Sequence, residues 1–372
     1  MLGDLGAEII KIESPNGGDI TRSYPPFRNG ESHYFVSINR HKKSVVIDLR
    51  KPEGVDIVRE MVTNVDILVE NFRPGVMTKL GLDYDGLAKI NPKLIYCAIS
   101  GFGMTGPLKD APSFDVVTQA MTGAMSINGG LGGEPTKMGI PLGDMVGGTF
   151  GPAAILAALY EREKTGKGRL IDVSLYDGML GMLAYFPQLA WFNGKDPGPV
   201  GTSHINIVPY GAYPTSDGKV VVACLTEGFW QKLCEALSMQ ELMTDPKYVS
   251  MPQRLANRIE LEAMLCERMI KFTTSEMLEL LDRHDVPNAP VMGITDAFNH
   301  PHAIARAMVV TVKHTTLGDI PVVGRPVKFP GAEQEPLAAP PTLGEHTDSV
   351  LRDELRLRDE QIAKLRADKV IS

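Results

Sequence analysis

Hydrophobic and polar residues alternate along the first half of the chain in a pattern that predicts short strands separated by helices. Runs rich in β-branched residues occupy 8–12, 44–49, 65–69, 94–99 and 170–175, and such runs are typical of strands. Apolar residues with a helical period extend from Pro52 to about Asn64, and a longer helix is expected from about Asp144 to Thr165. This alternation predicts βαβ units and a parallel sheet, which is an α/β fold class.

The pattern changes after about Gly201, and this change predicts a second domain. An Asp-Gly turn at 216–219 precedes a strand at 220–224, and helices are expected at about 228–237, 253–272 and 274–284. We expect a smaller α/β domain over 208–300, with linkers at 201–207 and 301–309. The large domain is expected to comprise 1–200 and 310–372, because charged helices at 347–369 would cover it.

Composition narrows the class of protein. The chain has 372 residues, of which 43% are hydrophobic and 22% charged, and this predicts a globular protein of two folding units. The net charge of −7 argues against a nucleic-acid partner. The chain has no run of about 20 apolar residues of the kind that predicts a membrane span. Four cysteines without CxxC spacing favour a reducing compartment, by default the cytoplasm or else an organelle matrix. The chain shows no His or Cys cluster of the kind that predicts a metal site.

The first residues are unusual for this fold class. Met1 is followed directly by LGDLGAEIIKIE, which reads as a helix end, a glycine turn and a strand, without a cleavable signal. A doubly wound sheet normally opens with a strand before such a helix. We therefore expect either that an opening strand is missing or that the start codon was assigned late.

Asp144 is the first candidate for chemistry. It stands between a glycine-rich turn and the start of the long helix, with small residues at Gly143, Gly147 and Gly148. An aspartate there can be an N-cap. It can also be a nucleophile, because a helix N-terminus favours the ionised carboxylate and small neighbours admit a bulky thioester. The separate glycine run at 128–133 lacks the context of a phosphate loop and predicts a surface turn or a substrate-side loop.

Several short motifs occur together in an order that resembles one family. They are LGAEIIKIE at 5–13, ENFRPG at 70–75, SGFG at 100–103, TGP at 105–107, FD at 114–115 followed by QA at 119–120, GD at 143–144, TGKG at 165–168 and LGEHT at 343–347. In this order they resemble the class III CoA-transferases, also called the CaiB/BaiF family. The resemblance covers nearly the whole chain.

This resemblance implies a doubly wound, Rossmann-like large domain, a small middle domain and an interlinked homodimer. It implies that Asp144 attacks an acyl-CoA to form a mixed anhydride and then an enzyme–CoA thioester, from which a carboxylic acid takes the CoA. Coenzyme A is then a substrate, and no tightly bound cofactor is implied. The residues that fall where the family binds CoA are Ile47, Asp48, Leu49, Arg50, Asn71, Phe72, Arg73, Lys79 and Phe114.

The substrate acids are less constrained by the sequence. Succinyl-CoA is a plausible donor on family grounds, and four basic residues could orient a dicarboxylate: Arg22, His33, Arg40 and His204. The long glycine loop of the formyl-CoA:oxalate branch is not evident between His204 and Asp217, so oxalate is not indicated.

Two alternatives remain open at this stage. The related α-methylacyl-CoA racemases use a His and Asp pair, but Phe114 stands where they have the histidine, and phenylalanine cannot move a proton. A catalytically silent CoA-binding protein is the second alternative, against which the intact Gly143–Asp144 pair argues. A nicotinamide-dependent dehydrogenase is more remote, because the glycine fingerprint is missing.

Overall fold

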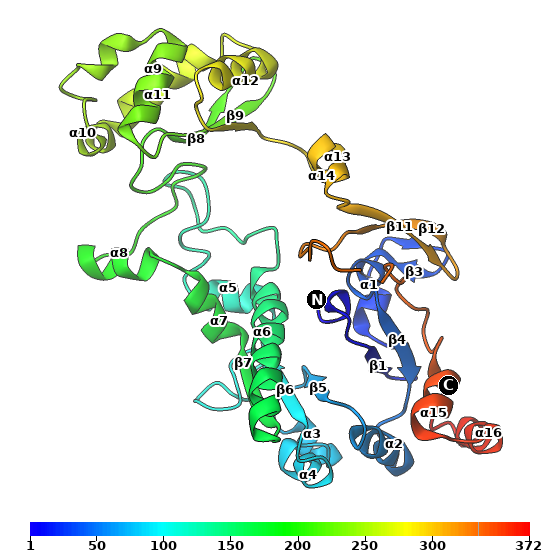
Figure 1. Ribbon diagram of the computed structural model, residues 1–372. Helices are drawn as coiled ribbons and strands as arrows, with labels where there is room; N and C mark the ends of the chain where they lie inside the picture. Colours follow the sequence, from blue (N-terminus) through cyan, green and yellow to red (C-terminus); the bar gives the residue numbers. More distant parts are fainter. Residues whose placement is uncertain (334) are drawn as a thin grey trace. The chain divides into compact units, whose positions relative to one another are not determined.

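The computed structural model describes residues 1–333 and 335–372 and has a mixed α/β fold with two compact units (Figure 1). The first unit combines Met1–Thr122, Gly139–Ala184 and Phe298–Ser372. The second combines Gly123–Met138 with Tyr185–Ala297, so most of the sequence expected in the small domain lies within it.

Parallel strands form the centre of the first unit. In one sheet β1 (Ile9–Glu13) pairs with β4 (Lys42–Val46), and in the other the order is β5 (Ile67–Glu70), β6 (Ile95–Ser100), β7 (Arg169–Ser174). Two antiparallel pairs complete the strands of this unit: β2 (Phe27–Arg28) with β3 (Glu31–Ser32), and β11 (Val309–His314) with β12 (Gly318–Val323).

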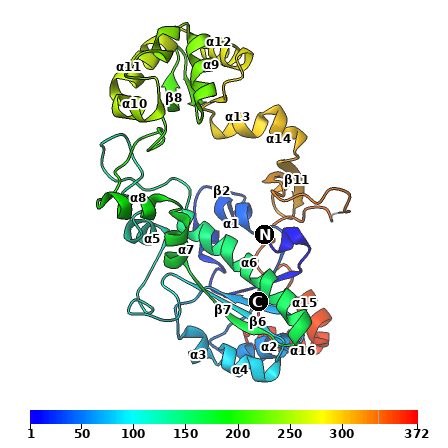
Figure 2. The same cartoon turned by 60° about the vertical axis from the view of Figure 1, so that its left-hand side comes forward.

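The helices of the first unit come from all three of its chain segments, as both views show (Figures 1 and 2). They are η1 (Gly3–Leu5), η2 (Ile20–Ser23), α1 (His33–Ile38), α2 (Pro52–Val62), α3 (Val76–Leu80), α4 (Tyr84–Ile90), α5 (Asp115–Met121), α6 (Leu142–Thr165), α7 (Leu175–Met182), α14 (Pro301–Ala305), α15 (Thr347–Leu355) and α16 (Asp359–Ala367).

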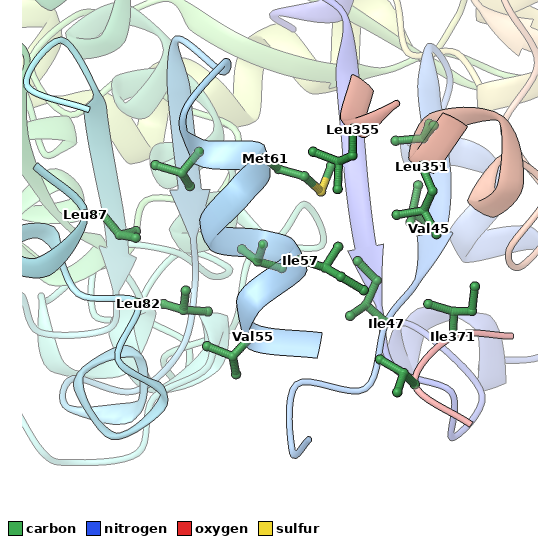
Figure 3. Packing of buried hydrophobic residues seen from close by; sticks show 14 of the residues in the cluster. Val45, Ile47, Val55, Ile57, Met61, Leu82, Leu87, Leu351, Leu355 and Ile371 are labelled. Atoms are coloured by element: carbon green, nitrogen blue, oxygen red, sulfur yellow. The ribbon is translucent and has the colours of Figure 1, made fainter. Parts of the chain in front are cut away.

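The main core of the first unit joins the two ends of the chain. Helix α15 packs on β4 and on α2, and α2 packs on α4. Figure 3 shows Ile47 and Ile57 beside Leu351 and Leu355, all of which are buried. Ile47 also forms a β-bridge with Ile371. Residues near the C-terminus therefore complete a core that the N-terminal strands begin.

Helix α6 contacts β6 and β7, and its Gly147 and Gly151 lie against β6. A Cβ at Gly147 would lie 3.1 Å from Ile99 Cγ2 and 2.7 Å from Leu175 Cδ2 at the start of α7, so a larger residue would force the Leu175 side chain to move. The helix has 24 residues and a mean hydropathy of 1.4 over its most apolar window, which by length and composition alone is enough to cross a membrane. This corrects the expectation that no segment has such a composition. Many of its apolar positions are small Gly and Ala residues that serve close packing.

The second unit has an antiparallel sheet covered by helices. Its strands are β8 (Tyr210–Pro214), β9 (Lys219–Ala223) and β10 (Asn288–Pro290), in the order β10-β9-β8. Its helices are α8 (Phe186–Asn193), α9 (Glu227–Leu237), η3 (Gln240–Met243), α10 (Met251–Ala256), α11 (Arg258–Met269) and α12 (Thr274–Arg283), and α13 (Ile294–Asn299) spans the boundary between the two units. Trp230, Leu265 and Leu281 lie in a core that shares no residue with those of the first unit.

Most predicted elements are confirmed, with two informative differences. Strand β4 ends at Val46 rather than at residue 49, because the Asp48 amide leaves the sheet and donates to the Val370 carbonyl (2.8 Å). The helix expected over 253–272 is broken at Asn257, whose side chain donates to the carbonyls of Lys247 and Gln253. An asparagine that bonds backbone carbonyls in this way competes with a continuous helix.

Candidate active site

Asp144 is the third residue of α6, so the N-cap interpretation is wrong. The helix begins at Leu142, and Pro141 is the capping residue. Among the described residues, no hydrogen-bond donor reaches the Asp144 carboxylate, and its side chain is exposed. The carboxylate therefore stands in the first turn of a helix without being used to satisfy that turn.

Asp115 binds the backbone donor next to Asp144. It is the first residue of α5 and is buried, and its Oδ1 accepts the Gly143 amide N–H at 2.9 Å. The Gln119 side-chain amide donates to both oxygens of the same carboxylate, at 3.0 and 2.8 Å. One of the free N–H groups that every helix leaves in its first turn is thus satisfied by an acid from a neighbouring helix.

The two carboxylates also interact through their charges. Partial burial first, and the negative charge of Asp115 second, raise the pKa of Asp144 above its ordinary value of 3.8. Burial and then the charge of Asp144 raise the pKa of the Tyr34 phenol on α1, so this phenol lies within electrostatic reach of Asp144. A like charge nearby disfavours ionisation and keeps the carboxylate more basic.

Gly143 allows the two helices to meet this closely. A Cβ at this position would lie 2.3 Å from Thr118 Oγ1 and 3.1 Å from Asp115 Oδ1. Thr118 cannot swing away without loss, because its hydroxyl donates to the Asp115 carbonyl at 2.8 Å and the residue is fully buried. The glycine before Asp144 thus has a packing role on the side of α5.

The ENFRPG segment lies at the same edge of the sheet as Asp144. The Asn71 side chain donates to the Ile99 carbonyl at the end of β6 (2.6 Å), and the Ile99 side chain lies against Gly147, one turn after Asp144. Ligands of parallel sheets bind outside the carboxyl ends of the strands. The structure therefore brings Asn71 and the nucleophile candidate to one edge.

A small pocket lies under this segment. Phe72 and Arg73 line it together with Glu70, Tyr96 and Ser100, and its volume of about 40 Å³ has room for a few water molecules. Burial raises the pKa of Glu70, whose carboxylate accepts the Phe72 amide N–H at 2.7 Å. The pocket is too small for a nucleotide, so any CoA contact of Phe72 involves its half-exposed outer face.

The segment after β4 is divided between core and surface. The Ile47 side chain is 1% exposed and lies in the core, where Leu49 packs against it. Asp48 accepts bonds from the Arg50 backbone and guanidinium, which lower the pKa of Asp48 to about 2. Of these four residues, Arg50 presents the exposed charge, since 68% of its side chain is accessible.

The remaining predicted residues are exposed. Lys79 lies near the end of α3 and forms no ion pair with the described residues, and neither does Arg73. Phe114 precedes α5 and is 75% exposed, next to the buried Asp115. In the described part of the chain, no group of three or more His, Cys, Asp or Glu residues could hold a metal ion.

Two of the four basic residues considered for a dicarboxylate are already bound to acids. Arg22 contacts Glu13 with both Nε and Nη2 at 2.8 Å, and Arg40 contacts Asp4 at 2.8 and 2.5 Å. These arginines therefore hold the fold together rather than awaiting a substrate. His33 is exposed at the start of α1.

His204 belongs to the second unit and has its own partners. Its Nδ1 accepts the Asn206 amide N–H at 3.1 Å, so Nε2 carries the hydrogen in the neutral ring and donates to the Tyr185 hydroxyl at 3.3 Å. Burial and the charge of Arg258 lower its pKa. The predicted glycine turn at 128–133 is also in this unit and is exposed at Gly132 and Gly133.

Sequence reasoning missed the residues that support Asp144. Thr118 and Gln119 are completely buried beside Asp115, yet the pattern marked only the QA pair as a motif and gave it no role. No motif or pattern in the sequence pointed to Tyr34. The signal available in the sequence was the FD pair at 114–115. In the structure its phenylalanine is exposed and its acid is buried, which is the reverse of the usual arrangement.

Comparison with known proteins identifies the class. Residues 1–347 match the family described as CoA-transferase family III. The chain is 38% identical over 371 residues to the succinyl-CoA:glutarate CoA-transferase of Mus musculus, covering all of this chain and 85% of the relative. It is 40% identical over 332 residues to the acetyl-CoA:oxalate CoA-transferase of Acetobacter aceti, covering 89% of this chain and 84% of the relative.

A solved structure agrees with this result. The crystal structure of a CaiB/BaiF family protein from Brucella suis superposes with a TM-score of 0.85 at 37% identity, covering 95% of this chain and 93% of the other. The fold and the sequence thus both define a CaiB/BaiF-type enzyme. The chain belongs to CoA-transferase family III and is a CoA-transferase.

Proposed function

We propose that this enzyme moves CoA from succinyl-CoA to a small carboxylic acid through covalent intermediates on Asp144. The observation that carries the proposal is the Asp144 carboxylate, which is exposed, receives no hydrogen bond from the described residues and has a raised pKa. A more basic carboxylate without a hydrogen bond is the better nucleophile toward a thioester.

The donor half of the reaction proceeds in two balanced steps. An Asp144 oxygen attacks the thioester carbon of succinyl-CoA, and the C–S bond breaks. CoA leaves as a thiolate, and the succinyl group remains on Asp144 as a mixed anhydride. The thiolate then attacks the Asp144 carbonyl carbon, which releases succinate and leaves a CoA thioester on the enzyme. Each step exchanges one activated acyl group for another, so exclusion of water preserves the energy of the thioester.

The acceptor half reverses these steps with a different acid. The acceptor carboxylate attacks the Asp144 thioester, which frees the CoA thiolate and forms an acceptor–aspartyl anhydride. The thiolate attacks the acceptor carbonyl carbon, and Asp144 departs as a carboxylate. No net proton is required, which agrees with Phe114 standing beside the site rather than a titrating histidine.

The choice of acids rests on the relatives. The mouse enzyme is named for succinyl-CoA and glutarate, and related enzymes of Chloroflexus aurantiacus and Haloarcula marismortui are named for succinyl-CoA with D-citramalate and with mesaconate. We propose a dicarboxylate of this size as acceptor.

For CoA itself we propose a site along the carboxyl edge of the strands. Asn71, Phe72 and Arg73 would line it, and the exposed cations Arg50 and Lys79 would meet the nucleotide phosphates. Backbone groups of 47–49 would contact the adenosine part, since the Ile47 side chain is buried. CoA is a substrate in this scheme, without a resident cofactor.

At the level of the whole protein we propose a cytoplasmic, interlinked homodimer. Its doubly wound large domain would comprise 1–200 and 310–372, and its small domain 208–300. Exposed aromatic side chains on α8, Trp191 at 71% and Phe192 at 87%, support a second protomer that covers them. Light scattering of the purified protein tests the dimer, and a mass equal to that of one chain would contradict it.

The test of the function is covalent trapping. Intact-protein mass spectrometry after mixing with succinyl-CoA, followed by hydroxylamine treatment and peptide mapping, is expected to find the adduct at Asp144. Asp144→Ala should give no adduct and lose CoA exchange by at least about 1,000-fold, because the nucleophile is absent. Asp177→Asn, which alters an acid on the neighbouring α7, serves as the matched control. Exchange by Asp144→Ala at the wild-type rate would rule out the mechanism.

A further inference from the structure

An acid and an amide side chain of α5, Asp115 and Gln119, form an arrangement at the start of α6. Asp115 is buried, yet it lies at the start of α5 with its carboxylate directed at the Gly143 amide. Gln119, one turn further along α5, holds both carboxylate oxygens. The acid is therefore fixed in orientation before any substrate arrives.

The consequence for α6 is geometric. In the first turn, the Leu142 amide donates to the Ile140 carbonyl and the Gly143 amide donates to Asp115. An aspartate in the first turn of a helix often folds back onto such free amides. With the Gly143 donor already taken by Asp115, the Asp144 carboxylate has less reason to fold back and remains directed outward.

The second consequence is electrostatic. A helix N-terminus stabilises a carboxylate anion and so makes it a weaker nucleophile. Partial burial first, and the Asp115 charge second, oppose this effect, so the pKa of Asp144 is raised rather than lowered. Asp115 thus keeps Asp144 at the helix terminus while offsetting the loss of basicity that this position would otherwise cause.

Resting on the proposed role of Asp144 as nucleophile, we infer that Asp115 is the positioning residue of this site, which fixes the first turn of α6 through the Gly143 amide and leaves the Asp144 carboxylate free to attack. It touches neither the thioester nor CoA in this role. Its effect reaches the reaction through the backbone of Gly143 and through its charge.

Other titratable groups surround Asp144 and must be considered in any pH experiment. Tyr34 on α1 is the phenol within reach. The elements packed on α6 also carry Tyr96 and Cys97 on β6, Arg169 and Asp172 on β7, and Tyr176 and Asp177 on α7. Arg169 pairs with Glu161, and Asp172 accepts the Met104 amide N–H. Among the acids, Asp115 is the one whose charge raises the pKa of Asp144.

Two substitutions separate the geometric role from the electrostatic one. Asp115→Asn retains an oxygen that can accept the Gly143 amide but removes the charge, whereas Asp115→Ala removes both. Asp217→Asn is the matched control, because Asp217 in the second unit likewise accepts a backbone N–H at a helix start, that of Thr274. It has no place in the site.

The first readout does not depend on transfer activity. In a carbon-13 titration of aspartate-labelled protein, with Asp144→Asn used to assign the signal, the Asp144 midpoint is expected to move to lower pH in Asp115→Asn, because the neighbouring negative charge is removed. Hydrogen exchange of the Gly143 amide should remain slow in Asp115→Asn and become about tenfold faster in Asp115→Ala. Asp217→Asn should change neither. An unchanged midpoint together with unchanged exchange would overturn the inference.

The second readout concerns the reaction. Thioester formation on Asp144 should slow by about 100-fold in Asp115→Ala and by less in Asp115→Asn, whose pH profile should move toward acid. If the titration and exchange results hold but wild-type protein is never acylated at Asp144, the proposed function fails while the positioning role stands. If wild-type protein is acylated and Asp115→Ala is acylated equally fast, the positioning role fails alone.

Discussion

At the scale of single residues, the absence of a side chain at Gly143 matters as much as the presence of one at Asp144. The glycine allows α5 and α6 to approach until a carboxylate on one helix reaches an amide on the other. The position is helical, so positive φ is not the reason for glycine there. Close packing against Thr118 is the reason.

We predict that Gly143→Ala reduces CoA transfer by at least about 100-fold, because its Cβ would stand 2.3 Å from Thr118 Oγ1 and force the first turn of α6 away from Asp115. Gly181→Ala in α7 is the control, since its Cβ would meet nothing within 4 Å. Steady-state kinetics should show the loss in kcat. Equal rates for the two variants would mean that the α5–α6 contact is dispensable.

The sequence marked Asp144, Gly143 and Asp115 but did not predict the contact between Gly143 and Asp115, and the reason is physical. Glycines beside an acid at a helix start are a local signal that can be read directly from neighbouring positions. The Gly143–Asp115 contact joins residues 28 positions apart. Such pairing depends on how two helices pack, which no local pattern encodes.

At the scale of elements, Glu13 connects three separate parts of the first unit. This buried acid at the end of β1 binds Arg22 in η2, the Ser44 hydroxyl on β4 (2.6 Å) and the Asp19 amide (3.0 Å). The Ser44 hydroxyl in turn accepts the Gly344 amide N–H at 2.9 Å. A single carboxylate thus holds the first strand, the loop after it and the segment before α15.

We predict that Glu13→Ala lowers the free energy of unfolding by about 3 kcal/mol, because it leaves the Arg22 guanidinium partly buried without its acid. Glu8→Ala, which breaks an exposed pair with Lys43, should cost less than about 1 kcal/mol. Urea unfolding followed by circular dichroism would measure both. Similar losses in the two variants would show that Glu13 has no special role.

The lowered pKa of Glu13 also determines how the stability of the fold changes in acid. Burial alone would raise the pKa of Glu13, but the bonds from Arg22 and Ser44 lower it below its ordinary 4.5, and Asp19 falls to about 2. A depressed pKa stabilises the folded state above the ordinary value, and this stabilisation is lost as the pH falls through the folded value. Glu13→Ala should therefore flatten the decline in stability as the pH falls below the ordinary value of 4.5.

Elements differ in how well sequence anticipates them. The helix from Pro52 was predictable, because its buried Val55, Val58 and Met61 recur at helical spacing. The end of β4 was not, because the residues that draw Asp48 out of the sheet are Val370 and Ile371, more than 300 positions away. The break at Asn257 likewise depends on the Lys247 carbonyl, which a helical period does not reveal.

At the scale of the whole molecule, each of the two units has a hydrophobic core of its own, and the cores of the two units share no residue. Ile47 and Leu351 belong to the first unit, and Trp230 and Leu265 to the second. Sequence predicted the presence of two folding units. It did not predict that Gly123–Met138 would group with the second, since that segment has no regular structure to mark it.

Cysteines offer a probe of each core. Burial raises the pKa of Cys97 in the first unit to about 11 and those of Cys224 and Cys234 in the second to about 12, while Cys266 is partly exposed. We predict that iodoacetamide at neutral pH labels only Cys266 at an appreciable rate in the native protein, because the other thiols are buried and protonated. Peptide mass spectrometry would show this.

In a urea series, pulses of the same reagent should label Cys97 and Cys224 at different urea concentrations, because each thiol reports its own core. Equal midpoints for both thiols would mean that the two units unfold as one cooperative body. Rapid labelling of Cys97 without urea would contradict the packing of β6.

The way the C-terminal residues close the first core has a consequence for synthesis on the ribosome. Val45, Ile47 and Val55 are made early but remain without their C-terminal partners until Leu351, Leu355 and Ile371 have emerged. The second unit, ending at Ala297, has all its residues before then. Nascent chains should therefore fold from the middle outward, and early apolar strands should need chaperone protection during most of translation.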